Sequence, residues 1–227
     1  MGCALLRWLH CIHVIAQTDI FAFPHHPDWG WFGLYSNAEA AHQLLPLLQN
    51  TSVSTVKLTG KWGSNVASVL LHLAPDTENI FLDSVGLTRV QSSWFSRLTQ
   101  LQQLEINNNF LSVLPGDLFG QTRQLRFFGA FGNRLARLPA GLLSGQPLLQ
   151  KIFLRSNKLS AISPSWLDGS KAAITHIYLQ DNNLTSLDAG MLQNLPKLEQ
   201  LFLEDNLLSQ LPWGLLEGCS RLNLLQL

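Results

Sequence analysis

Apolar residues recur along the chain in a short motif, apolar-x-x-apolar-x-apolar, at a nearly constant distance. The steps between successive motifs are 24 residues, with a single step of 25. A fixed period over seven intervals indicates a repeat architecture in which units stack, because one unit cannot bury its own apolar face. The motifs begin at Val53, Thr77, Leu101, Leu125, Leu149, Ile174, Leu198 and Leu222.

The start of each unit predicts a short strand. In residues 101–124, the clearest unit, Leu104 and Ile106 should point inward while Glu105 points outward, because side chains alternate along a strand. Stacking such strands in parallel buries one continuous apolar face and leaves the other face outward. The second half of the units carries further apolar pairs such as Leu118-Phe119, which predicts a packed opposite side of irregular or short helical structure.

Asparagine occupies the ninth position of five successive units, among apolar neighbours. A buried amide without hydrogen-bond partners costs roughly 1–3 kcal/mol. Asparagines repeated at one period can bond backbone groups of the turns within and between coils, so we expect a structural ladder. Its members are Asn109, Asn133, Asn157, Asn182 and Asn206.

The repeat skeleton resembles the leucine-rich-repeat family, whose consensus is L-x-x-L-x-L-x-x-N-x-L. The 24-residue length and the L-P-x-x-x-F-like second half resemble the subclass common in extracellular animal proteins, including the arrays of Toll-like receptors. The resemblance covers about residues 53–227. It implies an α/β solenoid: a horseshoe with a parallel concave β-sheet and an irregular or short-helical convex side. Cysteine-rich caps, usual in extracellular relatives, are missing at both ends.

The segments before the repeats divide in two. Residues 1–22 are a candidate signal peptide, since an interrupted apolar stretch runs from Ala4 to Ala16; the alternative is an uncleaved helix covering the end of the solenoid. Residues 23–52 are interpreted as an N-terminal cap, with a helix expected over residues 37–49. The last unit, from Leu222, is incomplete, and its strand is expected to expose an apolar edge.

The composition argues against two classes of function, nucleic-acid binding and membrane spanning. Charged residues are 13% of the chain, and 15 basic residues balance 15 acidic ones. This balance gives no basic footprint for nucleic acid, and no apolar run is long enough for a membrane span. The three cysteines form no C-x-x-C pair; Cys219 is expected to be a buried core thiol.

No motif of a hydrolase, a zinc protease, a P-loop or a dinucleotide-binding enzyme occurs in the sequence. His25, His26 and Asp28 do not define a coordination geometry, and we interpret them as a surface turn. We therefore expect no catalytic residues, no metal site and no cofactor.

The outward positions of the strands form a column of aromatic residues with charged neighbours. Exposed aromatic residues and arginine are enriched in protein interfaces, whereas aromatics also stabilise sheets generally. We favour a partner site centred on Arg155. The candidate partner-binding residues are Phe127, Phe131, Phe153, Arg155, Tyr178, Phe202, Glu204 and Asp205.

These features predict a recognition module that binds a protein or peptide on its concave face, as a secreted protein or part of a receptor ectodomain. Two sequons, at Asn50 and Asn183, are candidate glycosylation sites in that setting. The alternative is an intracellular scaffold or inhibitor that uses the same face, which the missing cysteine caps favour. We expect no nucleic-acid partner and no membrane insertion by this segment.

Overall fold

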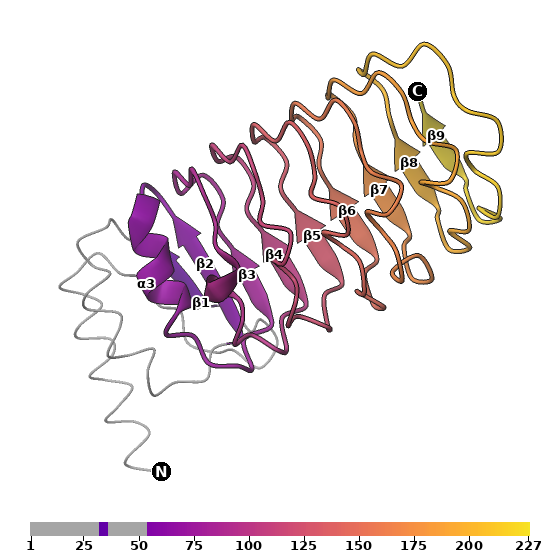
Figure 1. The fold of residues 1–227 in the computed structure, drawn as a ribbon. Coiled ribbons are helices and arrows are strands. Elements are labelled where there is room, and N and C mark those ends of the chain that lie inside the picture. Colours follow the sequence, from indigo (N-terminus) through magenta and orange to yellow (C-terminus); the bar gives the residue numbers. More distant parts are fainter. Residues whose placement is uncertain (1–31, 36–53) are drawn as a thin grey trace, which may run out of the picture.

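The structure is a computed structural model, and it describes residues 32–35 and 54–227. The described elements follow one another along a single elongated stack of coils (Figure 1). In chain order they are β1 (Phe32–Tyr35), β2 (Thr55–Thr59), the 3-10 helix η2 (Gly63–Asn65), α3 (Val66–Leu70), β3 (Asn79–Phe81), the 3-10 helix η3 (Ser92–Trp94), β4 (Gln103–Glu105), β5 (Phe127–Gly129), β6 (Lys151–Phe153), β7 (His176–Tyr178), β8 (Gln200–Phe202) and β9 (Leu224–Gln226).

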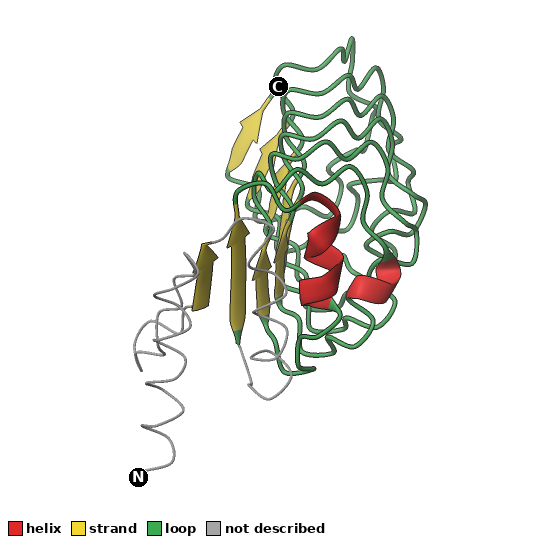
Figure 2. Ribbon diagram, turned by 90° about the vertical axis from the view of Figure 1, so that its left-hand side faces the viewer, coloured by secondary structure: helices red, strands yellow, loops and turns green. Residues whose placement is uncertain are grey.

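All the strands belong to one parallel sheet, in the order in which they occur along the chain. Their register follows the sequence period, since Leu104 pairs with Phe128 and Phe128 with Ile152. The predicted leucine-rich-repeat solenoid is therefore confirmed, with the sheet lining one side of the coils and loops forming the other (Figure 2).

The sheet has one strand more than the repeats predicted. Strand β1 pairs with β2 in parallel, Phe32 opposite Val56, so it lies 24 residues before its partner. This stretch was assigned to the cap and no strand was predicted there. The motif is nevertheless present in the sequence, because Trp29, Phe32 and Leu34 keep the apolar spacing 24 residues before Val53, Val56 and Leu58, and Asn37 falls at the ninth position. The candidate signal peptide and the helix expected over residues 37–49 lie outside the described residues, and the division into three segments remains a prediction.

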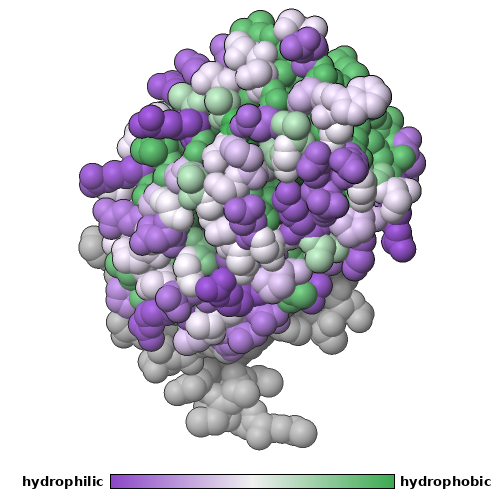
Figure 3. Space-filling view, turned by 45° about the vertical axis from the view of Figure 1, so that its right-hand side comes forward, coloured by the Kyte–Doolittle hydropathy of each residue, from purple (hydrophilic) through white to green (hydrophobic). Residues whose placement is uncertain are grey.

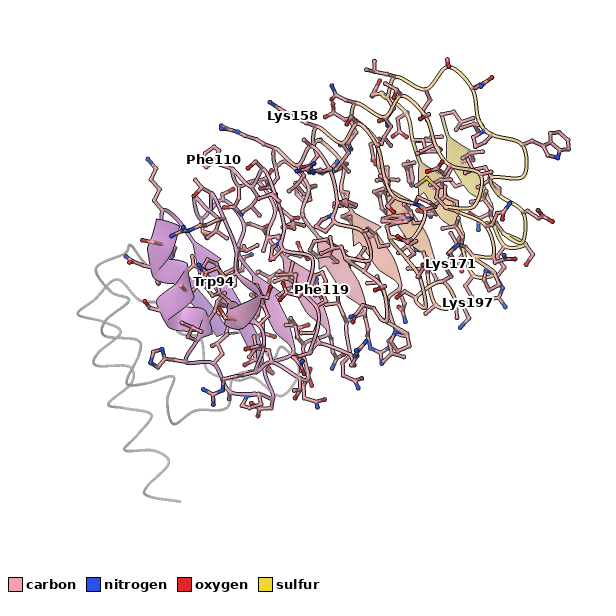
Figure 4. All side chains as sticks on the ribbon, viewed as in Figure 1. Trp94, Phe110, Phe119, Lys158, Lys171 and Lys197 are labelled. Carbon is pink, nitrogen blue, oxygen red and sulfur yellow. The ribbon has the colours of Figure 1, made fainter. Side chains whose placement is uncertain are left out.

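The inward residues of the strands and the apolar pairs of the loops form one continuous core. Leu104, Ile106 and Phe128 are fully buried, as the alternation predicted. The aromatic side chains of Trp94 and Phe119 fill the space near the loops, and Phe119 meets Phe128 edge-on at 5.0 Å between ring centroids (Figure 4).

The ninth-position asparagines lie inside the turn that follows each strand. The amide of Asn157 accepts a hydrogen bond from the backbone N–H of Leu135 and donates to the carbonyls of Ala130, Leu154 and Arg155, at 2.9–3.2 Å. Asn109, Asn133, Asn182 and Asn206 bond the equivalent backbone groups. Each amide thus satisfies polar groups of its own coil and of the preceding one.

A second row of polar residues runs through the loop side of the same coils. Gln146 and Ser170 donate to carbonyls 27 residues earlier, those of Phe119 and Leu143. The thiol of Cys219 lies in the same relation to the carbonyl of Leu192, at 3.2 Å. The expected buried core thiol is therefore wrong in part: Cys219 is half-buried and occupies this second row.

The last complete unit, from Leu198, and the incomplete unit from Leu222 expose apolar side chains. Trp213 is 99% exposed, and Leu207, Leu224, Leu225 and Leu227 also reach the surface. In the space-filling view, hydrophobic atoms gather at the upper end, where the last repeats lie (Figure 3). Among the described residues, no helix has the length and hydropathy needed to cross a bilayer.

Candidate functional site

Four aromatic rings from four consecutive strands stack along the outer face of the sheet. The ring centroids of Phe127 and Phe153 are 4.8 Å apart, those of Phe153 and Tyr178 4.2 Å, and those of Tyr178 and Phe202 4.6 Å. The planes of neighbouring rings differ by at most 21°. The spacing follows from the register, because adjacent strands lie roughly 4.8 Å apart. All four side chains are half-buried, since each ring covers its neighbour and leaves its outer edge in solvent.

A glycine allows the stack to begin on β5. Phe153, Tyr178 and Phe202 share one column of the sheet, but the β5 residue of that column is Gly129. The ring of Phe127, two residues earlier, lies over this glycine instead: a Cβ built on Gly129 would be 3.2 Å from Phe127 Cε1 and 2.9 Å from Asn107 Oδ1. The missing side chain therefore makes room for the first ring.

A second row, parallel to the stack, carries the exposed cation of the site. The guanidinium of Arg155 lies over the ring of Phe131, 4.7 Å from its centroid, in a cation–π contact. Such contacts stabilise by about 0.5–1 kcal/mol at exposed sites. Within the described part of the chain, Arg155 has no carboxylate partner, so its donors remain available to a ligand.

A hydrogen-bonded polar cluster borders the stack on its N-terminal side. The carboxylate of Glu105 accepts from the side-chain amides of Gln103 at 2.6 Å and Asn107 at 2.7 Å. Asn107 in turn accepts from the backbone N–H of Phe131, and its own N–H donates to Asp83. Burial raises the pKa of Glu105 and of Asp83, in each case against the effect of these hydrogen bonds.

The C-terminal border is acidic and less completely bonded. The Tyr178 hydroxyl donates to Gln200 Oε1 at 2.9 Å, and burial raises the pKa of this phenol. Glu204 is half-buried and Asp205 is exposed. On the other side of the stack, burial and the nearby Lys151 lower the pKa of His176, against the opposing charge of Glu199.

Between the two rows lies a shallow depression of about 320 Å³. Aromatic rings form much of its lining, with Arg155 and Glu105 contributing opposite charges. Its residues are Glu105, Asn107, Phe127, Phe131, Phe153, Arg155, Tyr178 and Gln180. A surface with apolar rings and a few polar groups can hold a side chain of a partner and fix its orientation.

The structure brings most of the predicted partner residues together. Phe127, Phe131, Phe153, Arg155 and Tyr178 line the depression. Phe202 extends the stack beyond it, and Glu204 and Asp205 lie on the same coil as Phe202. Whether a partner binds there remains a proposal.

Three residues that shape this site were not predicted to belong to it: Gly129, Asn107 and Gln103. The lone glycine in an otherwise bulky column was the available signal for the first of them. The hydrogen bonds of Asn107 and Gln103 depend on side-chain rotamers, which the repeat pattern does not indicate.

The remaining candidate sites lie away from the stack. Asn183 is exposed, and its backbone N–H donates to the carbonyl of Leu159. Asn50, His25, His26 and Asp28 lie outside the described residues. Within residues 54–227, no group of three or more His, Cys, Asp or Glu side chains is placed to hold a metal ion.

Comparison with known proteins supports the repeat assignment. The model of the leucine-rich-repeat family matches residues 75–135 and 172–227. Mouse (Mus musculus) Podocan is 29% identical over 97 residues, which are 41% of this chain and 16% of Podocan. The chain therefore spans a small part of the length of this relative.

Solved structures share the fold. A chain of the Drosophila Toll–Spatzle complex superposes with a TM-score of 0.67 and 25% identity, over 82% of this chain and 28% of that one. A chain of the TLR13–ssRNA13 complex superposes with a TM-score of 0.72 and 23% identity, over 85% and 27%. The family model covers more than half of the sequence and the whole sheet follows its period, so the chain belongs to the leucine-rich-repeat family.

Proposed function

We propose that this chain is a recognition module that binds a protein or peptide partner on the concave face of its sheet, and that it performs no catalysis. The observation that carries the proposal is the ring stack Phe127–Phe153–Tyr178–Phe202, which is open to solvent along one edge. Rigid aromatic side chains next to an arginine are typical of the residues that dominate binding energy at protein interfaces.

A protein partner fits the charges of this face better than a nucleic acid does. Arg126, Lys151 and Arg155 lie around the first half of the stack, but acidic residues surround the second half. Phosphate backbones require a continuous basic surface. Structures of similar fold include one in complex with the protein Spatzle and one in complex with an RNA, so the fold itself does not select the ligand class.

The test compares capture by two variants. Wild-type chain, a triple variant with Phe153→Ala, Tyr178→Ala and Phe202→Ala, and a control with Phe110→Ala and Val113→Ala are immobilised and exposed to secreted and cell-surface proteins. The control removes apolar side chains that are 49% and 53% exposed but lie off the stack. We expect a partner that the control retains and the triple variant loses, with both variants folded by circular dichroism. A partner that binds a folded triple variant as well as wild type would contradict the proposal.

We further propose that the chain acts outside the cell, as a secreted protein or within a receptor ectodomain. The exposed sequon at Asn183 supports this setting. Intact-mass spectrometry of the chain expressed in a secretory eukaryotic cell tests it, with medium and lysate measured separately. A glycosylated product in the medium, shortened near residue 16 or 22, is expected. A full-length, unglycosylated product confined to the lysate would favour the intracellular scaffold.

A further inference from the structure

The charges of the solenoid are separated along its length. Residues 125–173 contain seven Lys and Arg but one acidic residue, Asp168, whereas residues 174–227 contain six acidic residues but only Lys197 and Arg221 as cations. The boundary between these two regions falls between strands β6 and β7, in the middle of the ring stack. An average surface mixes the two signs, so this arrangement gives the stack a basic and an acidic half.

The same separation appears among the residues of the sheet face. Arg126 and Lys151 lie on one side of the stack and Arg155 on the other, all in the coils of β5 and β6. Beyond β6, the face carries acidic residues: Asp181 in the coil of β7, and Glu199, Glu204 and Asp205 in the coil of β8. Both flanks of the rings therefore pass from basic to acidic beyond β6. Glu105 of β4 is a further acidic residue, at the N-terminal border of the stack.

The polar groups at the boundary lack partners of the kind they need. Arg155 contacts only an aromatic ring, so its guanidinium lacks an anion within the described chain. Gln180 follows the next strand, β7, and its Oε1 has no hydrogen-bond donor within the described chain. Glu204 follows β8, and its Oε2 also has no donor there. A buried acceptor without a donor is unfavourable. A positively charged or amide donor that reaches this point, with a small rotation of either side chain, would relieve that cost.

We propose that the partner of this face is a dipolar peptide segment: a carboxylate that pairs with Arg155, an apolar side chain on the rings, and a cation that pairs with Glu204 and Asp205. This inference rests on the proposed function, and adds to it the chemistry and the orientation of the ligand. Arg155 and Glu204 are two strands apart, roughly 10 Å, which equals about three residues of extended chain. The segment therefore crosses the strands, with its acidic end towards β5.

Selection from a display library of short linear random peptides tests this chemistry directly. Wild-type chain is expected to enrich peptides with an acidic and a basic residue about three positions apart, on either side of an apolar residue. Peptides selected on the Arg155→Glu variant should no longer be enriched in the acidic residue. Peptides selected on the Glu204→Lys variant should no longer be enriched in the basic residue. Arg137→Glu is the matched control, because it makes the same charge change on an exposed arginine outside the face.

A charge swap between Arg155 and the acidic residue of the peptide tests whether the two pair directly. We expect Arg155→Glu to weaken the selected peptide roughly tenfold or more, and a peptide with Lys in place of its acidic residue to recover most of that loss on the variant. Peptides that are lost with Tyr178→Ala but show no charge pattern, or are insensitive to the swap, would overturn the dipolar inference and leave the proposed function intact. Enrichment of no peptide that depends on the rings would overturn both.

Discussion

Two ladders run through the same coils of this solenoid: the asparagine ladder and the ring stack, which forms an aromatic ladder. They differ in how completely their groups are bonded within the protein. The asparagine ladder is inside, and each of its amides bonds several backbone groups. The aromatic ladder is outside, and each ring has neighbours along the stack but an open edge. The repeat multiplies both kinds of contact, but only the outer ladder leaves interactions unmade. Structure and recognition can therefore be separated by asking which repeated groups are already satisfied.

The largest effect on stability is expected when one amide of the asparagine ladder is removed. Asn157→Ala removes four hydrogen bonds and leaves the N–H of Leu135 without its partner, whereas the carbonyls of Ala130, Leu154 and Arg155 each keep a second donor. We expect a loss of about 3 kcal/mol or more in unfolding free energy, and a fall in melting temperature on the order of 10 °C. Thermal unfolding followed by circular dichroism measures both.

The chain offers a matched control, because Asn183 is the same residue type at an exposed position next to the ladder. Asn183→Ala should change the melting temperature by no more than about 2 °C. Equal effects of the two substitutions would contradict the structural role of the ladder.

The second largest effect concerns the point where the outer ladder begins. In Gly129→Ala, the new methyl group meets Asn107 Oδ1 and the Phe127 ring at 2.9 and 3.2 Å. We expect a destabilisation of about 1–3 kcal/mol, measured by urea unfolding, as for other overpacked sites. Gly190→Ala, where nothing lies within 4 Å, is the control and should be nearly neutral. A stable Gly129→Ala protein with an unchanged near-ultraviolet spectrum would refute the close packing.

A smaller change separates the ring from its hydroxyl. Tyr178→Phe keeps the stack and removes only the hydrogen bond to Gln200, so it should cost about 0.5–1.5 kcal/mol or less. Tyr178→Ala removes the ring and two stacking contacts and should cost more, by urea unfolding. Equal stability of the two variants would show that the stack contributes nothing beyond the hydroxyl.

The smallest expected effect is a pH dependence at the N-terminal border. Burial raises the pKa of Glu105 above its ordinary 4.5, so the folded state binds its proton more tightly than the unfolded state does. Its contribution to stability is therefore fully present below pH 4.5 and is lost as the pH rises through the raised pKa. Relative to Glu105→Gln, wild type should lose stability as the pH rises from 4 towards 7. A difference that grows in the other direction would contradict the sign.

The period of the sequence was sufficient to predict the parallel sheet, its register and the inner ladder, because each depends on residue type at fixed intervals. Leu104, Ile106 and the ninth-position asparagines lie where the alternation and the period place them. The outward direction of Phe153, Tyr178 and Phe202 was predictable for the same reason.

Some features were not predicted, for two different reasons. Strand β1 keeps both the period and the apolar motif, but aromatic Trp29 and Phe32 stand where the clearest units have leucine, and the unit was overlooked. The other features depend on contacts that the period does not contain. Phe127 leaves its own column to lie over Gly129, and the polar cluster around Glu105 depends on rotamers. These contacts arise between side chains of adjacent coils, so a pattern within one repeat does not contain them.

The central claim is that the aromatic stack, and not another surface of the solenoid, contacts the partner. Site-specific photocrosslinking tests it most directly, with p-benzoylphenylalanine replacing Phe202 at the end of the stack or, in a second protein, Phe110, an exposed aromatic residue off the stack (Figure 4). We expect the partner found by capture to crosslink from position 202 and not from position 110. Crosslinking from position 110 alone would contradict the account and place the partner on the edge of the solenoid.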